Sequence, residues 1–457
     1  MELKILHTTD IHSNFENLSR VVTKIKEIKD ENTIILDAGD FSDFKKLELL
    51  GTKGLLAVEL LEYAGYDAIA VGNNEIFNGV DTLSNMATKS KVAFLSCNLY
   101  KKGLNKIKGI FKSTIIKRNG LNFLIIGTSP DLGDFYPLFD LELKNYIKAI
   151  KEEINLYKNK FDKCILLSHL GLNSDKDIAE NIEDIDLIIG GHFHILMDEA
   201  EVVNKKVIHT SGANAENLGL VKLKIDGEFK VIEAKNINVM DIKKDNGALD
   251  IIKKNKTIAL NNLNKPLYQI DKNLWHDVIE ENPITNLLAD SLNDILDCDI
   301  GIINSGVLNG GVKKGDVSEK KLLEICPSPL NPTCFEIKGK YIKNALENSL
   351  DGDFCLSDGQ GPGFRGKFLG RLHVSNAKIE HDGRNILNIY INGEKLKSDK
   401  YYKVASSDYL FRATGYNSFK HSKNEVYNKE LLRDVLRKYL LKNEFIESSY
   451  KERWELK

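Results

Sequence analysis

The stretch that decides the fold reads LKILHTTDIH and covers residues 3–12. Its first half, Leu3–His7, is a short apolar run, which is typical of a buried β-strand. The run is followed directly by Asp10 and His12, a carboxylate and an imidazole separated by one residue. In open α/β sheets, ligands bind beyond the carboxyl ends of the strands. This stretch therefore predicts a strand that leads into a metal-binding loop.

The same arrangement continues over residues 1–240. Amphipathic stretches of helical period, such as Leu18–Lys29, Leu55–Ala64 and Asn145–Tyr157, separate the apolar runs. Strand alternating with helix predicts an α/β domain with a mainly parallel sheet covered on its faces. The apolar runs are Leu3–His7, Thr33–Leu36, Ala68–Val71, Phe123–Ile126, Cys164–Leu167 and Leu187–Ile189.

Four of the later runs also end in potential metal ligands. The segments that follow them read DAGD (37–40), GNNE (72–75), SHLG (168–171) and GGHFH (190–194). One such segment alone is more often a turn or a surface histidine. Their recurrence at strand ends that we expect to belong to one sheet is difficult to explain by turn chemistry. The predicted metal ligands are Asp10, His12, Asp40, Asn73, His169, His192 and His194.

The predicted ligand set mixes oxygen and nitrogen donors and contains no thiolate. Such a set suits Mn, Zn, Fe or Co. If one carboxylate bridges two divalent ions roughly 3.5–4 Å apart, the pair can hold a hydroxide and clamp a phosphoryl group. We therefore expect two divalent metal ions. Asp37 and Glu75 are interpreted as groups that hold the loops, with metal ligation as the alternative.

The length of 457 residues predicts two or three domains. Residues 1–240 form the predicted metal domain, 241–264 a helical linker rich in lysine and asparagine, and 265–457 a second domain that mixes helices and strands. The alternative for the linker is an ordinary surface helix inside one domain.

Composition limits the partners. Lysine and arginine number 64 against 66 aspartates and glutamates, giving a net charge of −2. This balance argues against a nucleic-acid polymer or a membrane surface as partner.

The N-terminus does not resemble a signal peptide, and no apolar stretch approaches the roughly 18 residues of a membrane span. The six cysteines are scattered without a C-x-x-C, so we expect reduced thiols in a cytoplasmic protein. The oligomeric state is left open.

At these motifs the chain resembles the calcineurin-like metallophosphoesterases, and specifically the two-domain 5′-nucleotidase family. The resemblance implies an N-terminal metallophosphoesterase α/β sandwich and a C-terminal α/β nucleotide-binding domain. It also implies two metal positions that share one carboxylate. One position takes Asp10, His12, Asp40 and His194, and the other takes Asp40, Asn73, His169 and His192.

The second half resembles the family's C-terminal domain more loosely. The similar segments are 281–290, 304–306, 327–331, 366–369 and 406–416. The resemblance implies arginines that contact phosphate and aromatic rings that stack on a base, with Phe364 as the alternative to Phe368. The family's arginine after the asparagine–glycine loop is missing, and Arg371 is another cation that could replace it. The implied substrate-binding residues are Asn304, Arg365, Phe368, Tyr409 and Arg412.

One departure concerns the chemistry itself. Where the family has a catalytic histidine, this chain has Asn74, and Phe77 replaces the aspartate that would orient it. Asn74 is expected to contact the phosphoryl group by a hydrogen bond, but it cannot transfer a proton. General acid–base help is typically worth about 10²–10⁴-fold. His209 is a candidate substitute, although a structural role is the simpler interpretation.

The leading hypothesis is hydrolysis of a nucleotide phosphoester by a hydroxide that the metals activate. The first alternative is a phosphodiesterase acting on a cyclic nucleotide or a dinucleotide, because a better leaving group needs less help from an acid. The second is a weakly active nucleotide-binding sensor, against which the complete ligand set argues.

Overall fold

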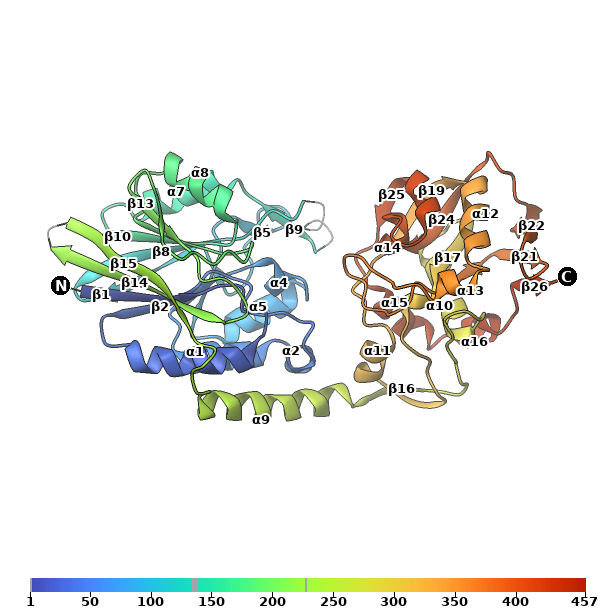
Figure 1. Ribbon diagram of the computed structural model, residues 1–457, viewed down its shortest axis with the longest axis horizontal. Helices are drawn as coiled ribbons and strands as arrows, with labels where there is room; N and C mark the ends of the chain where they lie inside the picture. The colour runs from blue at the N-terminus through green and yellow to red at the C-terminus, as the bar shows by residue number, and fades with distance from the viewer. Residues whose placement is uncertain (1, 134–135, 137–138, 227) are drawn as a thin grey trace. The chain divides into compact units, whose positions relative to one another are not determined.

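The computed structural model describes residues 2–457 except 134–135, 137–138 and 227. The chain divides into two compact units, Met1–Asn262 and Leu263–Lys457 (Figure 1).

Two sheets form the centre of the first unit. The first sheet has the order β15 (Glu228–Asn238), β14 (Asn217–Asp226), β1 (Glu2–Thr8), β2 (Thr33–Asp37), β3 (Ala68–Ala70), β4 (Ala93–Leu95) and β6 (Ile110–Phe111). The second has the order β12 (Glu201–Val203), β13 (Lys206–His209), β11 (Leu187–Gly190), β10 (Lys163–Ser168), β8 (Leu121–Thr128) and β7 (Ser113–Arg118). A separate pair joins β5 (Leu99–Lys101) to β9 (Leu141–Leu143). The central neighbours in both large sheets are parallel.

The two sheets pack face to face, and helices cover their outer faces (Figure 1). Alternate residues of β1 serve the two faces: Leu3 and Ile5 join the core between the sheets, whereas Leu6 joins the core under the helices. Because both faces are buried, the strands read as continuous apolar runs. The expectation that the predicted strand ends share one sheet was wrong, since β1–β3 lie in one sheet and β10 and β11 in the other.

Helices pack on each side of this sandwich. Those that contribute to the core of the first sheet are α1 (Phe15–Ile28), α2 (Leu47–Thr52), α3 (Leu55–Ala64), α4 (Asn73–Ile76), α5 (Val80–Lys89) and α9 (Asn246–Leu263). The second sheet is covered by α7 (Tyr146–Leu156) and α8 (Leu172–Asn181). The segment predicted as a linker contains α9, where Asn255 donates a hydrogen bond of 2.8 Å to Glu59 of α3.

The second unit is built around one apolar core. Its five-stranded sheet has the order β20 (Leu372–Ser375), β17 (Ile300–Asn304), β24 (Tyr401–Ser407), β19 (Pro332–Lys338) and β25 (Lys423–Tyr427). A four-stranded sheet has the order β23 (Glu394–Lys395), β22 (Ile386–Ile391), β21 (Ala377–His381) and β26 (Trp454–Leu456), and β16 (Pro266–Ile270) pairs with β18 (Gly315–Ser318).

The helices of the second unit include one, α10 (Pro283–Leu296), whose start is capped by an asparagine side chain. Asn282 accepts a hydrogen bond from the backbone of Thr285, and Pro283 occupies the first turn of α10. The other helices are α11 (Glu319–Ile325), α12 (Gly339–Asn348), α13 (Gly352–Cys355), α14 (Asp408–Phe411), α15 (Leu432–Tyr439) and α16 (Asn443–Ser449), with 3₁₀ turns η1 (Ser305–Val307) and η2 (Asn417–His421).

Close packing of the two sheets in the first unit requires a glycine at position 127. A Cβ atom added to Gly127 on β8 would lie 2.3 Å from the carbonyl oxygen of Leu95 on β4. We expect Gly127→Ala to lower the free energy of unfolding by about 1–3 kcal/mol, because the sheets must separate to admit the methyl group. Urea denaturation followed by circular dichroism measures this change. Gly352→Ala is the matched control, since nothing lies within 4 Å of an added Cβ there. Equal effects of the two substitutions would contradict the prediction.

Candidate metal centre

Loops from both sheets of the first unit bring the predicted ligands together. From the first sheet come the loop after β1 with Asp10, the loop after β2 with Asp40, and the start of α4 with Asn73. From the second sheet come His169 after β10 and the loop after β11. The two groups of loops meet at Asp10, whose carboxylate accepts a 3.0 Å hydrogen bond from the backbone of His192. The centre therefore lies where the carboxyl ends of strands from the two sheets come together.

Side chains of these loops form two potential metal-binding groups. The ligand atoms of Asp10, His12 and His194 lie within 4.8 Å of one another, and so do those of Asp10, Asp40 and His169. In the first group the Nε2 atoms of His12 and His194 are 2.9 Å apart, and each lies 3.6 Å from Oδ1 of Asp10. In the second group Nε2 of His169 lies 3.3 Å from Oδ2 of Asp40. The two groups share Asp10, whereas the sequence resemblance implies that Asp40 is shared.

His192 and Asn73 lie beside these groups. The ring of His192 is 5.2 Å from that of His169, measured between centroids. The side-chain oxygen of Asn73 is buried and has no hydrogen-bond partner among the described residues. A buried polar atom without a partner costs free energy, so a cation that binds this oxygen would remove the cost.

His169 provides the sharpest test of whether these residues fit a metal. Its ring is fully buried, and Nδ1 donates a 2.8 Å hydrogen bond to the carbonyl of Ala38. Nε2 has no hydrogen-bond partner among the described residues and faces the carboxylate of Asp40. Burial alone would lower the pKa of His169, but the charge of Asp40 raises it to about 10. The raised pKa means that a positive charge between the imidazole of His169 and the carboxylate of Asp40 is stabilised. A divalent cation bound there would supply this charge in place of the proton on Nε2.

The backbone at the predicted ligands adopts a conformation that is rare for residues with side chains. The φ angles are positive at Asp10 (50°), His12 (48°), Asp40 (55°), His192 (82°) and His194 (57°). Each such residue costs of the order of 1–3 kcal/mol, and such strain persists where the surrounding structure enforces it. Its concentration at the predicted ligands indicates that these loops are shaped for a function rather than for stability.

Two further carboxylates hold the loops from behind. Glu75 is fully buried and accepts hydrogen bonds from the backbone of Ser42 (2.7 Å), Gly72 (2.9 Å) and Asp40 (3.1 Å). It thereby ties the loop after β2 to the loop after β3. Burial raises the pKa of Glu75 to about 7, and the neighbouring charge of Asp40 acts in the same direction.

Asp37 has a similar role within the first sheet. Its carboxylate accepts hydrogen bonds from the hydroxyl of Thr8 (2.6 Å) and the backbone of Gly39 (2.9 Å). Neither Asp37 nor Glu75 belongs to the two metal-binding groups of the described residues, which agrees with their interpretation as loop supports.

Asn74 lies directly against the predicted centre. Its backbone donates a 2.8 Å hydrogen bond to one oxygen of Asp40, and its side-chain amide donates 2.7 Å to the other. The same amide nitrogen is 3.3 Å from Nδ1 of His12. Phe77 is 43% exposed, so it does not orient Asn74 as an aspartate would. In this arrangement Asn74 positions the Asp40 carboxylate.

His209, considered above as a substitute acid, is fully buried. Its Nδ1 lies 2.8 Å from Nε2 of His7, and burial lowers the pKa of His209 to about 4. A ring that is neutral and shielded from water at pH 7 cannot supply a proton to a leaving group. The histidine therefore has a structural role at the end of β13.

The predicted base-stacking residues of the second unit contact other side chains of the same unit. Tyr409 is fully buried, and its ring stacks on Phe364 with centroids 4.5 Å apart and planes 23° apart. Phe368 is half-buried, with Nζ of Lys367 4.7 Å above its ring. In this conformation Phe364 occupies one face of Tyr409, so stacking of a base between Tyr409 and Phe368 stays a prediction.

The predicted polar contacts of this region also have partners within the chain. Arg412 pairs with Asp408 at 2.7 Å, and the amide nitrogen of Asn304 donates a 2.6 Å hydrogen bond to the carbonyl of Leu369. Arg365 is exposed. Arg371 stacks its guanidinium over Trp454 at 4.4 Å. The side-chain oxygen of Asn304 is buried without a partner among the described residues, which leaves one acceptor for a ligand.

The sequence reasoning missed two groups near the metal centre. The hydroxyl of Thr9 donates a 2.7 Å hydrogen bond to Asp10, and the carbonyl of Ala38 orients His169. Thr9 stands next to a predicted ligand, which is a usable signal. A backbone carbonyl has no signature in sequence.

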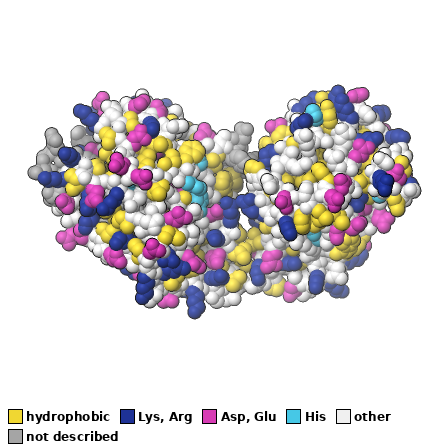
Figure 2. All heavy atoms as spheres, viewed as in Figure 1, with side chains coloured by type: hydrophobic (Ala, Val, Ile, Leu, Met, Phe, Trp, Pro, Cys, Tyr) yellow, Lys and Arg dark blue, Asp and Glu magenta, His cyan; other side chains and the backbone are white. Residues whose placement is uncertain are grey.

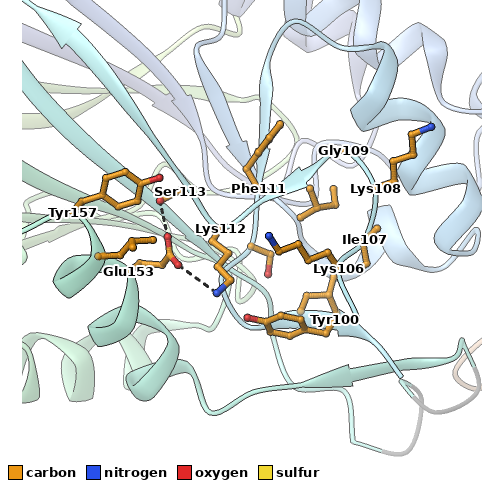
Figure 3. Close-up of a pocket in the computed structure, with 14 residues that line it drawn as sticks. Tyr100, Lys106, Ile107, Lys108, Gly109, Phe111, Lys112, Ser113, Glu153 and Tyr157 are labelled. Atoms are coloured by element: carbon orange, nitrogen blue, oxygen red, sulfur yellow. Dashed lines mark hydrogen bonds and ion pairs between the residues drawn. The ribbon is translucent and has the colours of Figure 1, made fainter. Parts of the chain in front are cut away.

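A cavity of about 440 Å³ in the first unit lies apart from the predicted ligands, and its lining includes none of them. Figure 3 shows Lys112 and Ser113 beside the carboxylate of Glu153 in this cavity.

On the face drawn in Figure 2, acidic and basic side chains are interspersed. Among the described residues, no helix is both long and apolar enough to cross a bilayer.

A two-sheet sandwich with carboxylate, amide and imidazole ligands at its strand ends, followed by a separate α/β unit, defines a metal-dependent phosphoesterase of two domains. Residues 3–196 match the calcineurin-like phosphoesterase family, and residues 261–421 match the 5′-nucleotidase C-terminal domain. The chain therefore belongs to the two-domain 5′-nucleotidase family of calcineurin-like metallophosphoesterases, which are phosphoric ester hydrolases.

Similar proteins extend over nearly the whole chain. An uncharacterized metallophosphoesterase of Bacillus subtilis, YunD, is 27% identical over 95% of this chain and 98% of its own length. The human 5′-nucleotidase is 26% identical over 93% of this chain and 85% of its length. Among solved structures, the NAD nucleotidase of Haemophilus influenzae has 16% identity and a TM-score of 0.65, covering 100% of this chain and 99% of that chain. The last of these comparisons supports the fold alone.

The loop support by Glu75 leads to a prediction about metal affinity. Glu75→Gln keeps one accepting oxygen and replaces the other by an NH₂ group, so it loses either the backbone hydrogen bond of Ser42, which Oε1 accepts, or those of Gly72 and Asp40, which Oε2 accepts. Loss of such a supporting group typically lowers metal affinity about 10–100-fold. Titration of the metal-free protein with Mn²⁺ or Zn²⁺, followed by calorimetry, measures this. Glu31→Gln, at an exposed position, should bind as the unchanged protein does; unchanged affinity in Glu75→Gln would argue against the supporting role.

Proposed function

We propose that this protein hydrolyses nucleotide phosphoesters at a centre for two divalent ions, drawn from Mn, Zn, Fe and Co. The observation that carries the proposal is the pair of ligand groups joined through Asp10, together with buried side-chain atoms of Asn73 and His169 that have no hydrogen-bond partner in the described part of the chain. The family supports a metal-dependent phosphoesterase, and relatives named 5′-nucleotidase support the nucleotide as substrate class.

The proposed centre holds its ligands through this chain's own contacts. Asp10 and Asp40 are buried, so their negative charges are poorly screened and attract cations strongly. Ala38 fixes the ring of His169 so that Nε2 is presented toward Asp40. When bound, divalent ions would polarise a phosphoryl oxygen and lower the pKa of a water molecule. The geometry of the side chains indicates that Asp10 would be the ligand common to both ions. The family resemblance implies instead that Asp40 would be the common ligand.

Asn74 leaves the proposed reaction without a proton donor for the leaving group at this position. Its amide orients Asp40 and carries no proton that it can give to a leaving group. His209 is also excluded as an acid by its burial and its contact with His7. The reaction should therefore depend on how well the leaving oxygen stabilises negative charge. The C-terminal unit is proposed to bind the nucleotide through Asn304, Arg365, Phe368, Tyr409 and Arg412.

The same observation supports a second candidate function, a nucleotide phosphodiesterase acting on a cyclic nucleotide or a dinucleotide. A centre without a proton donor favours substrates whose leaving group has a low pKa. The sensor alternative is weakened by the geometry, because a protein that only binds nucleotides has no need for strained ligand loops around Asp10 and Asp40.

The first prediction of this proposal concerns metal dependence. Protein stripped by a chelator should release no phosphate from a panel of nucleotides and their esters, and Mn²⁺ or Zn²⁺ should restore the activity. Asp10→Asn should lower the restored rate by at least about 10²-fold, because it weakens both ligand groups. Asp162→Asn, at an exposed position between α7 and β10 that belongs to neither ligand group, is the control. Failure of every metal-loaded sample to hydrolyse any member of the panel would refute the proposal.

The second prediction concerns Asn74. We expect Asn74→His to raise the rate with alkyl monoesters, whose leaving oxygen needs a proton, by about 10-fold or more. The gain should stay at the low end of acid catalysis, since Phe77 cannot orient the new ring. Aryl diesters should gain little. Steady-state kinetics on both substrate classes measure the difference, and Asn78→His on the neighbouring turn is the control. Equal gains on both classes would show that the missing proton donor does not limit the native reaction.

A further inference from the structure

Two cysteines of the second unit lie in contact although 36 residues separate them. The Sγ atoms of Cys298 and Cys334 are 3.1 Å apart. Both side chains are partly exposed, whereas Cys97, Cys164, Cys326 and Cys355 are buried. The two thiols of this pair are therefore the cysteines that a reagent dissolved in water can reach.

Strand pairing holds the two thiols in this position. Cys334 lies on β19 opposite Ala405 of β24. On the other side of β24, Gly301 of β17 also pairs with Ala405. Cys298 precedes β17 in the turn after α10, and Asp299 anchors that turn by a 3.0 Å hydrogen bond to the carbonyl of Lys403. The contact thus results from the sheet and does not depend on a mobile loop.

We propose that Cys298 and Cys334 form an oxidation-sensitive dithiol, which hydrogen peroxide converts to a disulfide. The thiol of Cys298 donates its hydrogen to the sulfur of Cys334. This hydrogen bond lowers the pKa of Cys334 to about 7 against the effect of burial, and the positive charge of Lys403 acts in the same direction. The pKa of Cys298 is raised. Cys334 is thus the attacking thiolate and Cys298 the resolving thiol.

The reaction balances in two steps. The Cys334 thiolate attacks one oxygen of hydrogen peroxide, the O–O bond breaks, and Cys334 becomes a sulfenic acid while hydroxide takes up a proton to form water. Cys298 then loses its proton and its thiolate attacks the sulfur of Cys334. The S–S bond forms, the S–O bond breaks, and the second hydroxide leaves as water. Two thiols are oxidised to a disulfide, and one peroxide is reduced to two waters.

The pairing is tested on the full chain with one equivalent of hydrogen peroxide, followed by alkylation and peptide mapping by mass spectrometry. We expect a linked peptide that contains Cys298 and Cys334, with the four buried cysteines recovered as alkylated thiols after unfolding. Recovery of both Cys298 and Cys334 as free thiols, or their linkage to other cysteines, would overturn the proposal.

Single substitutions test the order of attack. In Cys298→Ser, Cys334 should accumulate as a sulfenic acid that dimedone traps. In Cys334→Ser, Cys298 should stay a thiol under the same treatment. Cys326→Ser is the matched control and should still give the Cys298–Cys334 linkage. Trapping of sulfenic acid on Cys298 in place of Cys334 would overturn the assignment.

Discussion

The buried carboxylate of Asp10 is the contact on which the first unit's functional arrangement depends. Its backbone donates a 2.9 Å hydrogen bond to Gly39 of the loop after β2, and its side chain accepts one from His192 in the loop after β11. One residue therefore joins loops that belong to two different sheets. Because Asp10 also belongs to both metal-binding groups, any shift between the sheets would disturb the whole centre.

This arrangement places several costs at one end of the sandwich. Asp10 and Asp40 bury negative charge, and the loops that carry the ligands hold residues at positive φ. These costs are tolerated because the rest of the unit is well packed, with an apolar core between the sheets and one under the helices on either side. Glu75 and Asp37 offset part of this free-energy cost. Each accepts hydrogen bonds from backbone N–H groups that the ligand loops would otherwise leave unpaired.

The fold was predictable from the sequence where a local pattern decides it. The run Leu3–His7 lies within β1 (Glu2–Thr8), and Thr33–Leu36 lies within β2 (Thr33–Asp37). The assignment of all these runs to one sheet failed, because a strand buried on both faces reads the same whether its neighbour across the core is a helix or a second sheet. In the second unit, the sequence indicated aromatic residues but could not decide that Tyr409 stacks on Phe364.

By itself, the sequence determined which donors follow which strands, and that Asn74 stands next to Asn73 in the segment GNNE. These are properties of residue type and order along the chain. Only the tertiary structure decided that Asp10 is common to both ligand groups, that Ala38 orients His169, and that Cys298 meets Cys334. The physical reason is that each of these depends on a distance of a few ångströms between segments far apart in sequence. Such distances are set by sheet packing and strand pairing, which no local pattern records.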